Sequence, residues 1–449
     1  MQTERNTDLN YPAEVEKYLR KFGSDVWEPE TSPADKRFNN IAVIPAIMEY
    51  DNIKNLLLSL SALESEYLGE TLFLFVINNN VEADVETKKN NQDTIEYLRS
   101  IIKGNANDST AGLIIKASLN IALIDASSEN KELPLKESGV GLARKTGMDA
   151  ALRLFDYTNP AKKLLICLDA DCIVEKNYLT EIVKQFNKNN YSAGYVRFNH
   201  VLPDNEEEKR AIICYEIFLR YYVLGLKYSR SPYAFHTIGS TIICDHHSYI
   251  KAGGMNKRKA AEDFYFMEKL SKNYSINQIN GTCIYPSGRK SWRVPFGTGQ
   301  RVSRFLNKTH EEYMHYDPAT FEILKKWLTV LHNDKVMTGK EYLDSAESIS
   351  NLLYQFLIEN NFQTEWDKIL HNSVKDVQIH RQKLFWFDGF RTLKLIHYLR
   401  DNGFPQQNMF PALDRLFEMT ETKYDFKADD VIPGIEIQIQ YLELLRKLA

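Results

Sequence analysis

Cysteine is scarce in this chain, and its spacing forms no pairing pattern. The 449 residues include five cysteines, an odd number, and no C-x-x-C pair. Most of them lie inside apolar runs, as Cys167, Cys214 and Cys244 do. Buried thiols of this kind behave as small hydrophobic residues, and disulfides are rare in reducing compartments. We therefore expect reduced core cysteines in a cytoplasmic protein.

Long hydrophobic runs and an excess of one charge are also lacking. The first 18 residues have no apolar stretch of the kind that signal peptides carry. The most apolar segment, 212–226, is interrupted by Glu216 and Arg220 and is too short to span a bilayer. It predicts a buried helix, so we expect no transmembrane segment, and peripheral membrane attachment stays open. The 56 basic and 60 acidic residues are mixed along the chain, a pattern that does not point to nucleic acid.

The pattern of apolar residues predicts an α/β protein of two or three domains. Short apolar runs typical of buried strands alternate with helical patterns up to about residue 305, and beyond residue 318 every apolar pattern is helical. This alternation indicates a doubly wound, mostly parallel sheet. Strands are expected at 40–45, 71–77, 120–125, 164–168, 192–198 and 238–244. We expect an N-terminal extension (1–37), an α/β domain (38–305) and an α-helical region (306–449).

Two aspartates follow the strand expected at 164–168. Asp169 and Asp171 stand one residue apart, directly after five apolar residues. In parallel sheets, ligands bind beyond the carboxyl ends of the strands. Paired carboxylates suit Mg²⁺ or Mn²⁺, which prefer oxygen ligands and phosphates. The position favours a metal site over a simple turn.

Two further charged motifs lie at expected helix starts. Arg144 and Lys145 could pair with a phosphate, or they could form a solvated helix face. Glu262 and Asp263 follow a Gly-Gly pair and a basic loop. They could cap the helix that follows, or one of them could act as a general base. These residues alone leave both alternatives open.

Other motifs have weaker interpretations. Gly139-Val-Gly141 lacks the third glycine and the preceding strand of a dinucleotide site. His310 and His315 are one residue too far apart for the H-E-x-x-H zinc motif, although either could lend one ligand to a metal held elsewhere. The sequence Asp245-His246-His247 could bind a metal, but turn and helix-cap chemistry is the commoner role.

Taken in order, several motifs resemble those of inverting glycosyltransferases of the GT-A fold, close to family 2. The resemblance covers about residues 38–300. It rests on five segments, namely Pro45-Ala46-Ile47-Met48-Glu49, Asn78-Asn79-Asn80, Ala143-Arg144-Lys145-Thr146-Gly147, Asp169-Ala170-Asp171, and Gly253-Gly254-Met255 followed by Glu262-Asp263. Each match alone is weak, and their shared order and spacing give the resemblance its weight.

The resemblance implies a nucleotide-sugar donor, linked to UDP or GDP, and a carbohydrate or other hydroxyl acceptor. The donor diphosphate would lie on Mn²⁺ or Mg²⁺ held by Asp169 and Asp171. Asp263, beside Glu262, would deprotonate the acceptor. The remaining donor-binding positions implied by the resemblance are Pro45, Ala46, Glu49, Asn79, Arg144, Asp169 and Ala170.

Departures from the family pattern shape the prediction. Ile47-Met48 replaces the usual aromatic-asparagine pair, and Asn79 stands where an aspartate commonly reads the base. Residues 300–305 miss the Q-x-x-R-W spacing of processive members, so we expect transfer of a single sugar. Two alternatives are a nucleotidyltransferase, which would normally carry a glycine-rich loop after the first strand, and a non-catalytic nucleotide-sugar-binding scaffold.

Overall fold

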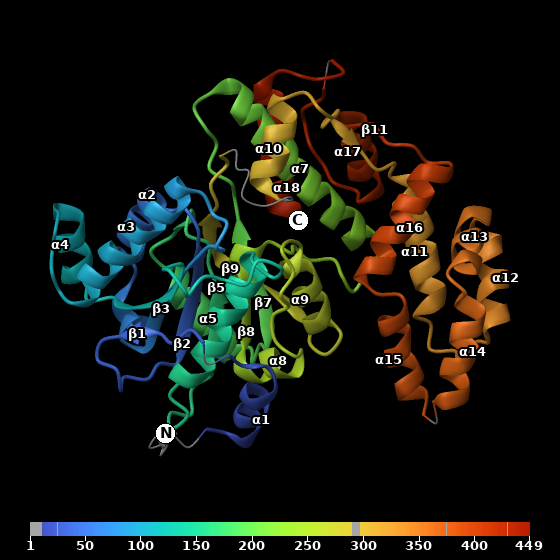
Figure 1. The fold of residues 1–449 in the computed structure, drawn as a ribbon. Coiled ribbons are helices and arrows are strands. Elements are labelled where there is room, and N and C mark those ends of the chain that lie inside the picture. Colours follow the sequence, from blue (N-terminus) through green and yellow to red (C-terminus); the bar gives the residue numbers. More distant parts are fainter. Residues whose placement is uncertain (1–10, 25, 290–296, 374, 429) are drawn as a thin grey trace. The chain divides into compact units, whose positions relative to one another are not determined.

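The protein divides into two compact units, an α/β unit and a helical unit (Figure 1). The computed structural model describes residues 11–24, 26–289, 297–373, 375–428 and 430–449. The α/β unit is formed mainly by residues up to 201 and by 237–287, and the helical unit mainly by 202–236 and 298–449. The chain therefore leaves the α/β unit after residue 201 and returns to it at residue 237.

A nine-stranded sheet forms the centre of the α/β unit. The strand order is β1-β4-β3-β2-β5-β8-β7-β9-β6. Strands β4, β3, β2, β5, β7 and β9 run in one direction, whereas β1, β8 and β6 oppose them, so the sheet is mostly parallel. The strands are β1 (Glu30–Thr31), β2 (Asn40–Ala46), β3 (Thr71–Asn78), β4 (Asn120–Ala126), β5 (Leu164–Cys167), β6 (Ile173–Val174), β7 (Ala193–Phe198), β8 (Ile242–Asp245) and β9 (Ile276–Tyr285). The predicted α/β class is confirmed.

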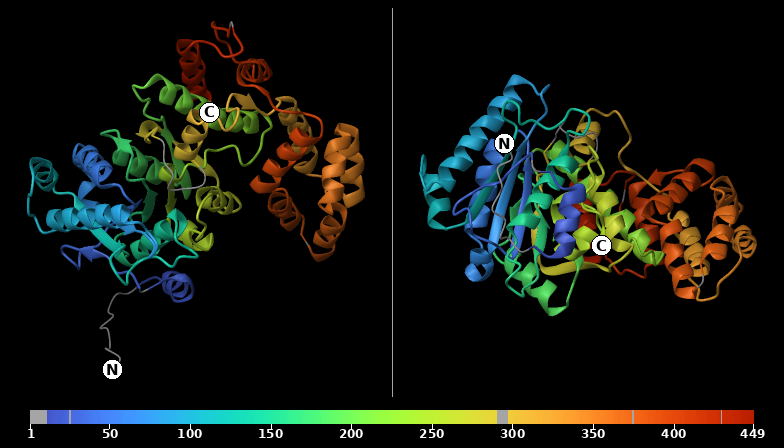
Figure 2. Two further views of the ribbon diagram at one scale, coloured as in Figure 1. Left: turned by 45° about the horizontal axis from the view of Figure 1, so that its top comes forward. Right: turned by 60° about the horizontal axis from the view of Figure 1, so that its bottom comes forward.

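Helices pack on both faces of this sheet (Figure 2). Every residue of β2 and β3 is buried, which explains why these strands are continuous apolar runs without alternation. The helices of this unit are α1 (Ala13–Phe22), α2 (Tyr50–Ser61), α3 (Val85–Ile102), α4 (Ser109–Lys116), α5 (Val140–Leu154), α6 (Tyr178–Lys188), α8 (His246–Lys251) and α9 (Glu262–Ser271). Two 3₁₀ turns, Ser65–Glu70 and Gly239–Thr241, precede β3 and β8.

Helix α5 lies almost entirely within the core. Its buried residues run without a break from Gly141 to Leu152. Gly147 lets the helix approach the sheet closely, because a Cβ at this position would lie 2.4 Å from Val43 Cγ1 and 2.9 Å from Val76 Cγ2. Close packing of this helix against β2 and β3 holds its N-terminal turn over the ends of the parallel strands.

The described part of the N-terminal segment belongs to the α/β unit and contributes to its buried contacts. The hydroxyl of Tyr18 in α1 donates to Asp149 Oδ1 at 3.0 Å, and Lys145 Nζ donates to Asp149 Oδ2 at 2.7 Å. Tyr249 in α8 also donates to Asp149 Oδ1, at 2.7 Å. These four buried groups compensate one another, as buried polar groups must. They join α1, α5 and α8. Residues 1–10 of the expected N-terminal extension lie outside the described residues.

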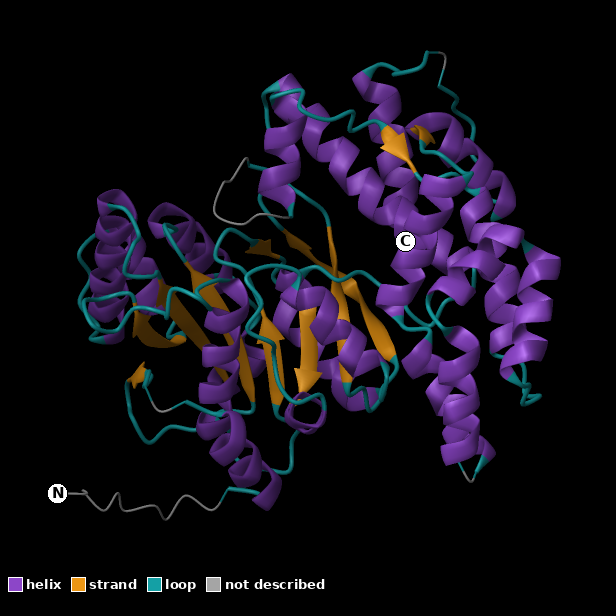
Figure 3. Ribbon diagram, turned by 45° about the vertical axis from the view of Figure 1, so that its right-hand side comes forward, coloured by secondary structure: helices purple, strands orange, loops and turns teal. Residues whose placement is uncertain are grey.

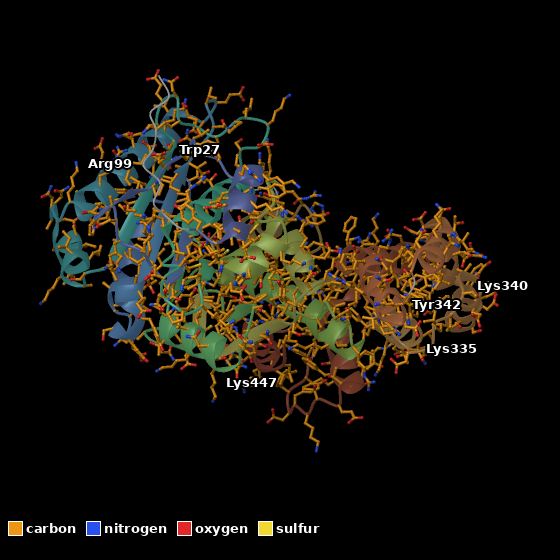
Figure 4. The ribbon with its side chains drawn as sticks, turned by 90° about the horizontal axis from the view of Figure 1, so that it is seen from below. Trp27, Arg99, Lys335, Lys340, Tyr342 and Lys447 are labelled. Carbon is orange, nitrogen blue, oxygen red and sulfur yellow. The ribbon has the colours of Figure 1, made fainter. Side chains whose placement is uncertain are left out.

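A second set of contacts attaches the segment that follows α1. Arg99 in α3 donates to both Glu30 oxygens, at 2.8 and 2.6 Å, and to Asp125 Oδ2 at 3.1 Å. Trp27 Nε1 donates to the carbonyl of Lys131 at 2.6 Å; Trp27 and Arg99 are labelled in Figure 4. Glu30, which pairs with Arg99, belongs to β1. This pairing helps to hold β1 along β4 at the sheet edge.

The second unit is built of helices, with one short strand pair, β10 (Met314–His315) and β11 (Gln407–Asn408) (Figure 3). Its core is rich in aromatic side chains, including Trp327, Tyr342, Phe362 and Trp366. The helices are α7 (Glu206–Tyr228), α10 (Thr298–Leu306), α11 (Ala319–Leu331), α12 (Gly339–Ile349), α13 (Asn351–Glu359), α14 (Phe362–Asn372), α15 (Asp376–Trp386), α16 (Gly389–Asn402), α17 (Met409–Met419) and α18 (Ile435–Leu448).

The two charges that interrupt the apolar segment in α7 are paired inside the helical unit. Arg220 Nε donates to Glu216 Oε1 at 2.9 Å, and Arg446 in α18 donates to both Glu216 oxygens, at 2.7 and 2.9 Å. Glu216 is fully buried, so these arginines supply the compensation that a buried carboxylate requires. The predicted buried helix is confirmed. None of the described helices is long and apolar enough to cross a membrane.

Residues 202–236 belong to the compact helical unit, whereas the expected α/β domain ran without a break from 38 to 305. The expected limits at 37 and 305 stay a prediction. A chain cut at residue 305 would keep α7 and lose its partner α18.

The close approach at Gly147 generates a stability prediction. Gly147→Ala adds a methyl group where Val43 and Val76 leave no room. Overpacking of this kind costs about 1–3 kcal/mol, so the free energy of unfolding in urea should fall by that amount. The matched control is Gly112→Ala in α4, where the nearest atom to an added Cβ is 3.9 Å away. It should gain up to about 1 kcal/mol from helix propensity. Equal effects at both positions would contradict the packing account.

Candidate active site

The carboxyl ends of β2 and β5 define the place where a ligand is expected. From β2 the chain passes to β3 and β4 on one side, and then returns to β5 on the other side of β2. The strand order therefore reverses between β2 and β5. In open α/β sheets, ligands bind outside the carboxyl ends of the strands at such a reversal.

Asp169 and Asp171 stand at this reversal. Leu168 N donates to Val43 O at 3.1 Å, which continues the β2–β5 ladder one residue beyond the strand. A turn follows, in which Cys172 N donates to Asp169 O at 3.2 Å. The side chain of Asp169 is 36% exposed, and Asp171 is half-buried. The turn thus ends the strand with two accessible carboxylates.

The guanidinium of Arg144 joins the two acidic motifs. Its Nη2 donates to Asp169 Oδ1 at 2.6 Å, and its Nη1 donates to Glu262 Oε1 in a shorter contact. The Arg144 side chain is 1% exposed and that of Glu262 is 6% exposed. The three charges come from α5, the turn after β5 and the first residue of α9. The predicted pairs Asp169/Asp171 and Glu262/Asp263 therefore belong to one cluster.

Three glycines allow the elements that carry these charges to approach one another, because glycine has no side chain. A Cβ on Gly141 would lie 2.2 Å from the Arg258 carbonyl oxygen, and one on Gly139 would lie 2.8 Å from Lys259 Cα. The loop that leads into α9 is thereby placed against the start of α5. A Cβ on Gly239 would lie 2.7 Å from Arg144 Nη1. The Gly139-Val-Gly141 sequence is thus explained by backbone packing.

The electrostatics of the cluster shift several pKa values. Burial by itself lowers the pKa of Arg144, but the charges of Asp169 and Glu262 outweigh it, and its pKa is raised. Burial raises the pKa of Glu262, although Arg144 opposes the shift. Burial, followed by the charge of Glu262, raises the pKa of Asp263 to about 7. A carboxylate with a pKa near 7 has the proton affinity that suits a general base.

The start of α9 shows whether Glu262 or Asp263 is the residue that caps this helix. The residue at the N-cap position is Ala261, which has φ 57° and provides no side-chain cap. A left-handed conformation is costly for a residue with a Cβ, and such strain is often found at functional sites. Asp263 Oδ1 accepts from the backbone N–H of Phe264 at 2.7 Å. Both acids therefore lie in the first turn of α9, after its cap.

The predicted donor-binding residues after β2 lie at the same edge of the sheet. Pro45 and Ala46 are the last residues of β2 and are buried. Glu49 is the N-cap residue of α2 and is 6% exposed, and its Oε2 accepts from Asn52 Nδ2 at 2.5 Å. Ala170 is buried in the turn between the two aspartates. Their contacts with a donor stay a prediction.

Asn79 holds strands together in this structure. Its Oδ1 accepts from Asn91 Nδ2 at 2.8 Å and from the hydroxyl of Ser127 in a shorter contact. Its Nδ2 donates to the carbonyls of Asn80 and Ser127, at 3.1 and 3.3 Å. The Asn79 amide is 2% exposed and is satisfied internally. Its predicted role in reading the base remains a prediction. Asn91 and Ser127 belong to no recognisable motif, and sequence reasoning missed them.

The chemistry of the donor set fits a divalent cation that also binds phosphate. Among the described residues, neither aspartate belongs to a group of three or more carboxylates, histidines and cysteines at ligand spacing. Mg²⁺ is commonly held by one or two carboxylates together with substrate phosphates, so a pair of aspartates is sufficient. Arg144 occupies one oxygen of Asp169, which leaves the other for a ligand.

The two histidines considered as further metal ligands belong to the helical unit. His310 is exposed, and its Nδ1 lies 3.3 Å from the hydroxyl of Thr309. His315 is fully buried and stacks on Tyr221 with ring centroids 4.5 Å apart. Burial lowers the pKa of His315 to about 3. These contacts are those of a surface histidine and a core histidine, and metal ligation by either stays a prediction.

Comparisons with known proteins give only distant similarity. No family model matches the chain, and no curated protein matches it. Among solved structures, residues 1–349 of S. aureus TarS in complex with UDP-GlcNAc show 13% identity and a TM-score of 0.38, over 88% of this chain and 95% of that one. The mannosyltransferase PcManGT from Pyrobaculum calidifontis, with GDP-Man and Mn²⁺, shows 12% identity and a TM-score of 0.36, over 86% and 90%. Similarity at this level carries no argument about the chain.

The buried guanidinium generates a second stability prediction. Arg144→Met leaves Glu262 buried without its cation, which typically costs about 3–5 kcal/mol of unfolding free energy. Adding Glu262→Gln to this variant should recover part of the loss, because the unpaired charge is then removed. Arg20→Met, at an exposed arginine in the last turn of α1, is the control and should change stability by about 0.5 kcal/mol or less. Additive losses in the double variant would show that the two residues are not coupled.

Proposed function

We propose that this protein is a metal-dependent, inverting glycosyltransferase of the GT-A fold, similar to family 2, which moves one sugar from a nucleotide-sugar donor to an acceptor hydroxyl. The observation that carries this proposal is the Arg144 bridge between Asp169 and Glu262. It unites the two acidic motifs at the strand reversal, where a ligand is expected. A donor-side carboxylate pair and an acceptor-side carboxylate then lie within one site.

The donor is proposed to be UDP- or GDP-linked. When bound by Asp169, Asp171 and the diphosphate, Mn²⁺ or Mg²⁺ would offset the charge on the departing nucleoside diphosphate. Arg144 holds Asp169 in place through its 2.6 Å contact, so it is a positioning residue. Pro45, Ala46, Glu49, Asn79 and Ala170 remain the proposed surroundings of the nucleotide.

Asp263 is the proposed general base. The acceptor oxygen forms a bond to the anomeric carbon while the bond from that carbon to the diphosphate oxygen breaks. The hydroxyl proton passes to Asp263, and the bonding electrons leave with the nucleoside diphosphate. A single displacement inverts the configuration at the anomeric carbon. Burial, and then the charge of Glu262, raises the pKa of Asp263, which supports this role.

Two other functions remain to be distinguished. A nucleotidyltransferase normally has a glycine-rich loop after the first core strand, but Pro45-Ala46-Ile47-Met48 ends β2 without a glycine. A non-catalytic scaffold would need no base, whereas Asp169, Asp171 and Asp263 are all retained in this chain. Calorimetry with UDP and GDP, with and without Mn²⁺, tests donor binding. A screen of nucleotide sugars for released nucleoside diphosphate then tests transferase chemistry.

Asp171→Ala should abolish metal-dependent nucleotide binding and leave the fold intact. Asp171 is a half-buried residue in the turn beyond the strand, outside the sheet core. Calorimetry at saturating Mn²⁺ provides the measurement, and circular dichroism checks the fold. The control is Asp204→Ala, at an exposed aspartate in another acid-x-acid triplet that does not directly follow a strand. Equal nucleotide affinity in Asp171→Ala and the parent would remove the metal-site proposal.

Asp263→Asn should lower the turnover number by a factor of roughly 10²–10⁴, the usual contribution of a positioned base. Donor affinity should change little, because Asp263 is proposed to face the acceptor. Steady-state kinetics and calorimetry measure the two quantities. Asp108→Asn makes the same exchange at the N-cap of α4 and should leave turnover unchanged. Glu262→Gln is expected to lower stability as well as turnover, because Glu262 pairs with Arg144.

Asp263 also determines how the activity should depend on pH. A base must be ionised, so kcat/KM should rise with pH, reach half its maximum near pH 7, where half of the Asp263 carboxyl is ionised, and level off above that. A bound cation would move this limb to lower pH, because positive charge favours the carboxylate. The limb should vanish in Asp263→Asn. Activity that increases as the pH falls would contradict a carboxylate base.

A further inference from the structure

A cluster of potential metal ligands lies between α1 and α8, which pack against each other in the α/β unit (Figure 1). Glu14 belongs to the first turn of α1, and His246 and His247 are the first two residues of α8. Each offers one ligand atom, and these atoms all lie within 4.8 Å of one another. It is the only such group of three found among the described residues.

Both histidine rings face the same carboxylate oxygen. His246 Nε2 lies 3.9 Å from Glu14 Oε1, and His247 Nδ1 contacts that oxygen more closely. The two rings lie side by side, with centroids 3.9 Å apart. Around a tetrahedral zinc with bonds of about 2.0–2.1 Å, ligand atoms are about 3.3 Å apart. Small rotations of the exposed Glu14 and His247 side chains would give this spacing.

The ring of His246 is held in position by aromatic neighbours. It packs on Tyr157 and Phe155, with centroids at 5.5 and 6.3 Å. The residue is 7% exposed, so the ring is fixed by packing with its Nε2 directed to the Glu14 carboxylate.

The lysines near the cluster already have partners. Lys162 Nζ lies 3.7 Å from Asp245 Oδ2. Lys163 Nζ donates to Asn39 Oδ1 at 3.0 Å and to the carbonyl of Asn159 at 2.7 Å. Asp245 in turn accepts from Ser248 N at 2.7 Å, as the N-cap of α8. Both lysine ammonium groups are therefore held by oxygen acceptors other than Glu14.

We propose that Glu14, His246 and His247 form a zinc site that attaches α1 to α8, separate from the carboxylates Asp169 and Asp171. Imidazole ligands favour Zn²⁺ over Mg²⁺ or Ca²⁺, which prefer oxygen. Water would fill the fourth position, because the Glu14 and His247 side chains are 43% and 62% exposed. A metal bound to the folded protein alone would stabilise the N-terminal helix on the unit. This inference does not depend on the proposed glycosyltransferase function.

Zinc titration of the full-length protein, freed of metal by chelator dialysis, tests the site. We expect one equivalent of Zn²⁺ to bind and to raise the melting temperature. His247→Ala and Glu14→Gln change exposed side chains, so they avoid the folding risk of altering buried His246. Each should weaken zinc binding by more than the roughly 10–100-fold typical for loss of a ligand's outer hydrogen-bond partner. His310→Ala and Asp171→Ala should bind zinc as the parent does.

X-ray absorption at the zinc edge identifies the ligands directly. Nitrogen and oxygen neighbours without sulfur are expected, because the five cysteines are buried elsewhere. The proposal is wrong if the parent protein binds no zinc, if His247→Ala retains full affinity, or if sulfur neighbours are found. Loss of zinc binding in Asp171→Ala, with binding intact in His247→Ala, would likewise overturn it and assign the metal to the aspartate pair.

Discussion

The ion cluster around Arg144 is the interaction on which the candidate site depends. A guanidinium that is 1% exposed would be costly without compensation, and here two carboxylates from distant segments provide it. The same contacts keep Asp169 and Glu262 from repelling one another in a region of low dielectric. Their geometry is thereby fixed before any substrate binds. A site with its charges already oriented needs little reorganisation during a reaction.

Close backbone packing is the second requirement, and it comes from glycine. Gly147 brings α5 onto β2 and β3, while Gly139 and Gly141 bring the loop before α9 onto the start of α5. The position of Glu262 relative to Arg144 depends on both approaches. The Gly-x-Gly sequence that suggests a dinucleotide site therefore has a structural role in backbone packing. It allows two backbone segments to meet beside a buried charge.

Sequence reasoning succeeded where local pattern determines structure and failed where tertiary contacts do. The runs at 71–77 and 164–168 predict strands because burial on both faces leaves no alternative to continuous apolar residues. The short strand β6 and the helix α1 were not predicted, because few of their residues are buried. The Asp169/Asp171 pair was recognisable from its place after a strand. The pairing of Arg144 with Glu262, 118 residues away, and the internal hydrogen bonds of Asn79 have no local signal.

The pairing of Glu216 with Arg446 sets an order of events during synthesis. Helix α7 is made between β7 and β8, whereas Arg446 follows Glu216 by 230 residues. Until α18 leaves the ribosome, the carboxylate of Glu216 lacks the two hydrogen bonds that Arg446 donates. The helical unit therefore cannot complete its core before α18 has been made. The apolar surface of α7 that the later helices cover stays exposed while those residues are synthesised, when nascent chains are most open to aggregation and to chaperones.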